Sequence, residues 1–205
     1  MPINIFNTFN DPKAITGTTE ALGVNDTDQI VGRYQDATGL HGFLESGGTY
    51  TTLDDPLATL GITVAQGINA AGQIVGQYNT GTGAHGFLLS GGTYTTLDDP
   101  LATSGTVAHG INATGQIVGF YANATGFHGF LLNGGMYTTL NDPSATLGTA
   151  AFGINAEGQI VGFFNNATGS TRSGHRPDRN PAMQQSPGIG GLSKIPEQLR
   201  FAPRT

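Results

Sequence analysis

The sequence predicts an all-β protein made of four-stranded antiparallel repeats of about 43 residues, arranged as a β-propeller or a propeller-like array. Three observations support this prediction: a repeat of nearly fixed period, turn residues that divide each repeat into four short β runs, and a composition poor in helix formers. The 205 residues include 33 Gly and 10 Pro, and 11% of them are charged. This composition favours tightly turned β structure. With no Cys in the chain, disulfides and thiolate metal sites are excluded.

Full copies of the repeat begin at Gly23, Gly67 and Gly110, and a fourth copy begins at Gly153, so the starts are 44, 43 and 43 residues apart. The second copy reads GINAAGQIVGQYNTGTGAHGFLLSGGTYTTLDDP. A fixed period of this length predicts a supersecondary unit that buries its apolar faces against neighbouring units. The competing architecture is an elongated β-solenoid, whose coils are usually shorter and do not form consecutive hairpins.

Each predicted strand ends at a turn signal. In the second copy, the strands are expected at residues 63–68, 73–78, 85–89 and 93–97. The first turn needs a left-handed residue at Gly72, and Asp28 holds this place in the first copy. The third and fourth strands are joined by a tight hairpin at Gly91-Gly92. The fourth strand ends at Asp98-Asp99-Pro100, because Pro cannot continue the ladder.

Two features of the second and third strands predict how the units pack. Ile74 and Val75 are adjacent, so both faces of that strand are apolar, as expected when a sheet is covered on each side. Gly76 and Gly86 recur in every full copy. We expect these glycines to let neighbouring sheets approach closely.

The repeat pattern breaks at both ends of the chain. We expect a β-repeat domain over residues 1–171, with an N-terminal strand at residues 4–12 that matches a fourth strand and belongs to another unit. The fourth copy should carry a His at residue 171, but the sequence there reads TRSGH. Residues 172–205 lack alternation and are expected to be a disordered or non-native tail. A shift of reading frame after residue 170 would restore a His-Gly pair.

The charge of the repeat domain argues against nucleic acid as a partner. Residues 1–171 contain 2 Lys or Arg against 12 Asp or Glu, whereas the tail contains 6 against 2. An acidic surface repels the phosphate backbone. No apolar run approaches the ~20 residues of a membrane span, and the N-terminus lacks the features of a signal peptide.

The pattern GINxxGQIVGxY…HGFLxxGGxYTTLDDP, repeated over residues 4–169, resembles the HAF family of bacterial extracellular repeats. The resemblance implies a secreted or surface-exposed bacterial protein. It supplies no catalytic residues.

The repeated polar residues suggest two kinds of site. His41, His85 and His128 invite a metal or catalytic role, but equivalent positions in a ring lie too far apart for one ion. We therefore expect each His to form hydrogen bonds that tie a turn to a neighbouring strand or unit. Asp55, Asp99 and Asp142 each precede a Pro, and such side chains usually cap turns. With the residues before them, these Asp form the acidic pairs Asp54-Asp55 and Asp98-Asp99 and the related Asn141-Asp142 and Asn10-Asp11. Calcium is the alternative at these pairs, and no other cofactor is expected.

The residues that vary between copies are where a ligand surface would be tuned, and they include Arg33, Gln77, Phe120 and Glu45. None of them forms an acid–base pair at a credible spacing. The sequence therefore favours a non-catalytic binding or structural module with a glycan or protein ligand. The alternative is a glycan-processing hydrolase or lyase that uses a propeller channel. An incomplete array would also leave an open strand edge for pairing with another copy.

Overall fold

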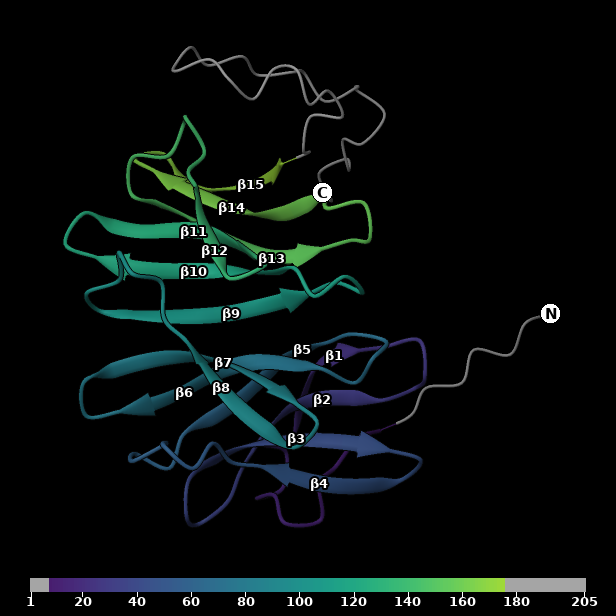
Figure 1. Ribbon diagram of the computed structural model, residues 1–205. Coiled ribbons are helices and arrows are strands. Elements are labelled where there is room, and N and C mark those ends of the chain that lie inside the picture. Colours follow the sequence, from purple (N-terminus) through teal and green to yellow (C-terminus); the bar gives the residue numbers. More distant parts are fainter. Residues whose placement is uncertain (1–7, 176–205) are drawn as a thin grey trace, which may run out of the picture.

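The computed structural model describes residues 8–175, and within these residues the chain forms fifteen β-strands and no helix (Figure 1). The predictions for residues 1–7 and 176–205 lie outside the described residues. The strands are β1 (Glu20–Val24), β2 (Ile30–Gln35), β3 (Leu40–Ser46), β4 (Thr49–Leu53), β5 (Thr63–Ile68), β6 (Ile74–Thr80), β7 (Gly83–Ser90), β8 (Thr93–Leu97), β9 (Gly105–Ile111), β10 (Ile117–Asn123), β11 (Gly126–Asn133), β12 (Met136–Leu140), β13 (Gly148–Ile154), β14 (Ile160–Asn166) and β15 (Gly169–His175).

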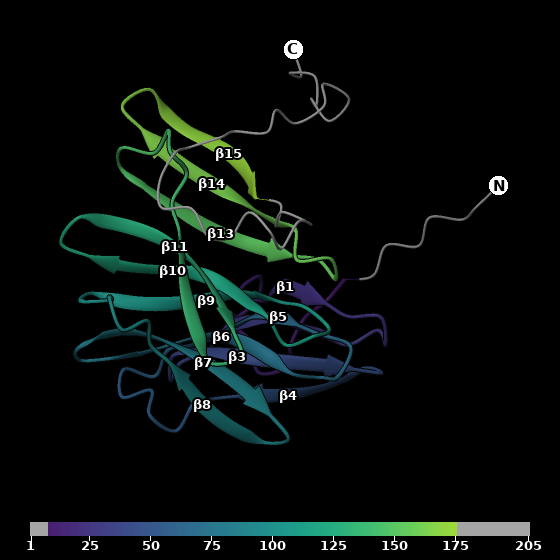
Figure 2. The same ribbon diagram turned by 45° about the horizontal axis from the view of Figure 1, so that its top comes forward.

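The strands form consecutive antiparallel hairpins. β1 to β4 make a four-stranded sheet, and the remaining strands share a second sheet in which β8 pairs with β7 and β12 with β11. Within this second sheet, successive groups of strands are joined by single parallel pairs, Ala84 with Gly105 and Phe127 with Gly148. Figures 1 and 2 show the groups following one another in chain order, from β1–β4 to β13–β15. The all-β prediction is confirmed, and no pairing joins β1 to β15 among the described strands.

The turns have the predicted backbone conformations. Gly72 has φ +74°, and Asp28, which holds the same place in the first copy, has φ +58°. Gly91 and Gly92 both have positive φ, as a two-residue hairpin with the twist of its flanking strands requires. The chain therefore reverses direction at the positions that the turn residues indicate.

The core lies between successive groups of strands rather than inside one sheet. Ile74 belongs to one buried cluster, with Leu53 and Phe87, whereas the adjacent Val75 belongs to the next, with Ala108 and Phe130. The second strand is thus covered on both faces, as its sequence predicts. In each of the first three units, the third strand contributes one of the largest fully buried side chains: Phe43, Phe87 and Phe130.

An asparagine after each first strand connects it to the following group of strands. The side-chain Nδ2 of Asn25 donates to the carbonyl of Asn69 (3.0 Å), that of Asn69 to Asn112 (3.1 Å), and that of Asn112 to Asn155 (3.0 Å). Each Asn Oδ1 also accepts the backbone N–H of the residue four positions later. The Asn side chain therefore closes the turn after its own first strand and also hydrogen-bonds to the backbone that follows the first strand of the next unit.

A second connection runs through the Asp that precedes each Pro. The backbone N–H of Asp55 donates to Thr63 Oγ1 in the following first strand (3.1 Å), and its Oδ1 accepts the N–H of Leu57 (2.9 Å). Asp99 and Asp142 make the same pair of bonds. These side chains form the turns that lead from one unit into the next.

The glycines that allow close approach differ from those expected. A Cβ on Gly76 would meet the carbonyl of Val64 and the ring of Phe87, both in its own hairpin group. This glycine therefore allows close packing within one group and not between neighbouring sheets. The close approach between groups occurs at Gly67, where a Cβ would lie 2.6 Å from the carbonyl of His109. First strands of successive groups therefore touch at backbone level.

The two ends of the array depart from the sequence predictions in detail. β15 continues to His175, beyond the expected boundary at residue 171, and pairs with β14 throughout. Thr171 lies opposite Phe164, as His128 lies opposite Tyr121, so it occupies the position where His was expected. At the other end, the expected strand at residues 4–12 is described only from Thr8, and no strand is assigned to residues 8–12. Asp11 nevertheless donates its N–H to Thr19 Oγ1, like Asp55 to Thr63.

No helix long and apolar enough to cross a membrane occurs within residues 8–175.

Replacing Asn69 by Ala tests the connection between first strands. Asn69 is 4% exposed, so the substitution leaves buried backbone groups without partners, and we expect the free energy of unfolding to fall by about 2–3 kcal/mol. Asn155 is the matched control, because it is exposed and, within residues 8–175, its side chain bonds only to Gln159. Asn155→Ala should cost about 1 kcal/mol or less in chemical denaturation, and equal losses would contradict the role of the Asn bridge.

Candidate functional site

Each first strand contains a β-bulge, and the extra residue differs from one copy to the next. The pairing register shifts between Ala21 and Gly23, between Ala65 and Gly67, and between Ala151 and Gly153, while the same step in β9 separates Ala108 from Gly110. The bulged residues are Leu22, Gln66, His109 and Phe152. Bulges re-aim side chains and recur next to functional sites. The fold thus presents a variable residue at one constant place in each copy.

The bulged residues lie beside the variable residues of the second strands. Val64 pairs with Gln77 and Val107 with Phe120, one strand away from the bulge. Arg33, Gln77, Phe120 and Phe163 therefore extend the row that the bulges begin. We call the bulged residues, these second-strand residues and Phe127 of β11, which packs against Phe120, the bulge face.

In the last two copies, the bulge face becomes a continuous aromatic row. Phe127 packs edge-on against Phe120 (ring centroids 5.4 Å apart), and Phe120 lies 5.6 Å from His109. The ring centroids of His109 and Phe152 are 4.4 Å apart, and those of Phe152 and Phe163 are 5.4 Å apart. Phe127 is 49% and Phe152 43% exposed. The other three rings of the row, those of His109, Phe120 and Phe163, are half-buried. Exposed aromatic side chains packed against such a row are a feature of interaction surfaces.

The first two copies place polar groups at the second-strand position, although the bulged residue of the first copy is Leu22. Arg33 forms an ion pair with Glu20, with Nη2 and Oε2 2.6 Å apart, and both side chains are substantially exposed. The second copy has two amides, Gln66 and Gln77. The bulge face therefore changes along the array from a charged pair through amides to aromatic rings.

Glu45, the fourth residue predicted to tune a ligand surface, lies elsewhere. It pairs with Ile30, which is three residues before Arg33 in the same strand, so its side chain lies on the opposite face of the sheet. Glu45 is buried, and its Oε1 accepts the N–H of Gly48 at 2.7 Å. The carboxylate closes a hairpin, and only Arg33, Gln77 and Phe120 share the bulge face.

His109 is the residue of this face that sequence comparison missed. The sequence of β9 does not reveal that its bulge contains an extra residue. The only signal of a variable position is that the residues equivalent to His109 in the other copies differ, namely Leu22, Gln66 and Phe152. Its Nε2 is buried without a hydrogen-bond partner among the described residues. Burial between Phe120 and Phe152 lowers the pKa of the His109 imidazole to about 4. The ring is therefore neutral near pH 7 and acts as an aromatic surface.

The repeated histidines make local hydrogen bonds. His41 Nδ1 lies 2.9 Å from Asp54 Oδ1, and its Nε2 lies 2.9 Å from Thr38 Oγ1. His85 and His128 make the corresponding bonds with Asp98 and Asn141. Each imidazole also stacks on a Tyr, with ring centroids 5.0–5.2 Å apart. Each His thus ties the turn between its second and third strands to the end of its fourth strand.

The electrostatics of the first histidine follow from these contacts. Burial lowers the pKa of His41, but the bonds and charges of Asp54 and Asp36 outweigh this effect and raise it. The hydroxyl and N–H of Thr38, with a smaller effect of His41, lower the pKa of the Asp36 carboxyl to about 2. The cluster is a charged turn rather than an activated nucleophile.

The acidic pairs divide their carboxylates between different partners. Asp54 bonds to His41, whereas Asp55 is buried, accepts the N–H of Leu57 and has its pKa raised by desolvation. Within residues 8–175, no group of three or more His, Asp or Glu side chains is placed to hold a metal ion. Calcium binding at these pairs stays a prediction.

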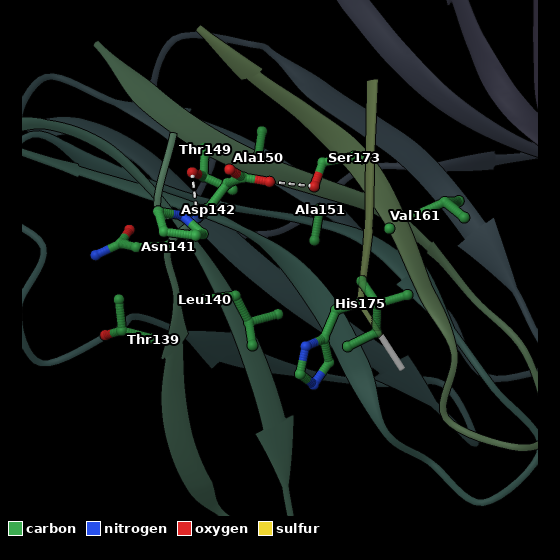
Figure 3. A pocket seen from close by; sticks show the side chains of 14 residues that line it. Thr139, Leu140, Asn141, Asp142, Thr149, Ala150, Ala151, Val161, Ser173 and His175 are labelled. Atoms are coloured by element: carbon green, nitrogen blue, oxygen red, sulfur yellow. Dashed lines mark hydrogen bonds between the residues drawn. The ribbon is translucent and has the colours of Figure 1, made fainter. Parts of the chain in front are cut away.

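An open cavity of about 280 Å³ lies between β12 and the last three strands (Figure 3). Its walls include Leu140, Ala151 and Ser173. Ser173 occupies the register position that Phe130 holds in β11, so the cavity lies where a buried ring is replaced by a hydroxyl. The Ser173 hydroxyl donates to Asp142 at 2.5 Å and is thus bonded to a carboxylate rather than to His175.

Comparison of the chain with protein-family models gives no match, and comparison with curated proteins gives none either.

His109 makes a testable contribution to the pH dependence of stability. Its pKa is lower in the folded state than the unfolded value near 6.5, so the unfolded chain takes up the proton first as the pH falls. The stabilisation present above pH 6.5 should therefore be lost between about pH 6.5 and 4, by up to about 3 kcal/mol.

Urea denaturation at a series of pH values, compared with that of His109→Gln, checks this contribution. The variant carries the residue of the second copy, Gln66, and keeps the opposing effect of His41. The free energies of unfolding of the two proteins should diverge above pH 4 and reach a constant difference above pH 7. Parallel curves would show that His109 titrates as an exposed residue.

Proposed function

We propose that the protein is a non-catalytic repeat protein whose sheets are blades of an open, propeller-like array, and that its bulge face binds glycans. The observation that carries the proposal is the aromatic row from Phe127 to Phe163. A secreted or surface location is part of the same proposal, supported by the repeat pattern that resembles the HAF family.

The division between constant and variable positions supports a binding role. The Asn bridges, the Asp turns and the buried Phe residues recur from copy to copy, whereas the bulge face differs in every copy. Enzymes built on repeats place unlike polar groups together at one point. Here the residues that vary between copies lie along a row, and those of the last two copies are aromatic. A row of this kind suits an extended ligand.

The chemistry of the bulge face fits a carbohydrate chain. Flat aromatic rings pack against the apolar C–H faces of sugars, while nearby amides and charged groups can bond to hydroxyls. The face offers both kinds of group in order, with Gln66 and Gln77 between the charged pair and the rings. The acidic repeat domain disfavours nucleic acid as the stacked ligand.

A glycan array combined with a hydrolysis assay tests this proposal. Binding without turnover would support it, and turnover would favour the glycan-processing alternative. Absence of glycan binding would overturn the glycan assignment, and binding to a protein partner through the same residues would replace it.

Two substitutions taken from the second copy locate the surface. Phe120→Gln and Phe127→Ala introduce the residues found at Gln77 and Ala84, and each should weaken glycan binding about tenfold or more. Met136→Thr is the matched control: Met136 is 75% exposed on β12, and other copies have Thr there. Equal effects of all three variants in a titration experiment would place the ligand elsewhere.

A further inference from the structure

The two ends of the array carry complementary halves of one strand pair. In the first three units a fourth strand, β4, β8 or β12, pairs antiparallel with the third strand. β15 occupies the third-strand place in the last unit, and among residues 8–175 it pairs only with β14. At the other end, residues 6–12 read FNTFNDP and match YTTLDDP at residues 50–56 position by position. Within residues 8–175 the last unit therefore has no fourth strand, whereas the sequence of residues 6–12 matches one.

The junction that follows a fourth strand is already formed at the N-terminal end. Asp11 is buried, its N–H donates to Thr19 Oγ1 (3.1 Å), and its Oδ1 accepts the N–H of Lys13 (2.8 Å). These are the bonds that Asp55 makes after β4. The chain therefore enters the first unit as though it had just left a fourth strand.

The cavity under β15 supplies the second observation. In the other units the Tyr of the fourth strand packs against the buried Phe of the third strand, with ring centroids 5.3–5.5 Å apart. In the last unit that Phe is replaced by Ser173, which leaves the cavity of about 280 Å³ shown in Figure 3. Phe6 holds the Tyr position in the N-terminal segment. Its ring, which has no hydroxyl, suits a cavity lined by Leu140 and Ala151.

We propose that residues 5–9 of a second copy of this chain add to β15 as its fourth strand and join the copies head to tail. Addition of an extended segment to an exposed strand is a general mode of recognition. The register of β11 with β12, moved by one repeat, places Ser173 opposite Thr8, Gly174 opposite Asn7 and His175 opposite Phe6. Phe6 then lies on the same face as Ser173 and diagonal to it, directed at the cavity.

A second copy is favoured over closure within one chain because of where the ends lie. β1 packs against β2 and β5, whereas β15 packs against β14. In Figure 1 and Figure 2, β15 lies at one end of the stack, whereas β3 and β4 lie toward the other and β1 lies beside β5. Two different patches meet in such a contact, so the assembly is a ring if the rotation closes and a filament if it does not.

Disulfide trapping tests the register directly, because the natural chain has no Cys. Chains carrying Ser173→Cys are mixed with chains carrying Thr8→Cys under mild oxidation, and we expect a covalent heterodimer. The control pair replaces Thr8→Cys by Asn7→Cys, whose side chain is on the other face of the strand and should not react. Equal trapping in both pairs, or none in either, would overturn the proposal. A double variant with both Ser173→Cys and Thr8→Cys that forms an intramolecular disulfide as a monomer would also overturn the proposal.

Analytical ultracentrifugation of the full chain provides an independent measurement. The unsubstituted protein should associate with increasing concentration, and Asn7→Pro should weaken this association about tenfold or more, because Pro disrupts strand pairing. Asn7→Thr, which introduces the residue of Thr51 and Thr95, should retain it. A monomer at all concentrations, or equal association of both variants, would contradict the proposal. Glycan binding by Asn7→Pro should be unchanged, so this test and that of the proposed function fail separately.

Discussion

The contact between first strands of successive units is the constraint on which the rest of the structure depends. The glycine at the start of each GIN motif lets the backbone of the next bulge approach, as at Gly67 against the carbonyl of His109. Two residues later, the Asn side chain donates to the backbone of the next unit. Together they fix the spacing of the units, and the bulged side chains are held in a row as a consequence.

This arrangement separates the residues that hold the fold from those that vary. The Asn bridges and Asp turns satisfy backbone groups between units, and the buried Phe rings fill the space between sheets. The buried Phe rings lie on the opposite side of the sheet from the bulge face, since Phe87 pairs with Gly76, the neighbour of Gln77. Side chains there can change from Gln66 to His109 to Phe152 without altering the contacts that position them. A repeat of this kind tolerates variation where a ligand would be recognised.

Local chemistry made most of the fold predictable from the sequence. Positive φ at Gly72 and Asp28 follows from turn geometry, and burial of both Ile74 and Val75 follows from their adjacency. The bulges were not predictable in this way, since one extra residue in an apolar strand leaves no composition signal. His109 was therefore missed as a site residue, and Glu45 was included because variation alone does not reveal which face a side chain occupies. Whether the array closes depends on the angle between units, which no single repeat encodes.

We propose a division of roles in which the repeated residues hold the fold and the bulge face holds the ligand. It is tested most directly by giving the second copy the side chains of the third, with Gln66→His and Gln77→Phe in one chain. Calorimetric titration with a glycan that the natural protein binds, together with chemical denaturation, provides the measurement. We expect tighter binding, with a free energy of unfolding within about 1 kcal/mol of that of the natural protein. Unchanged affinity, or loss of the folded state, would contradict it.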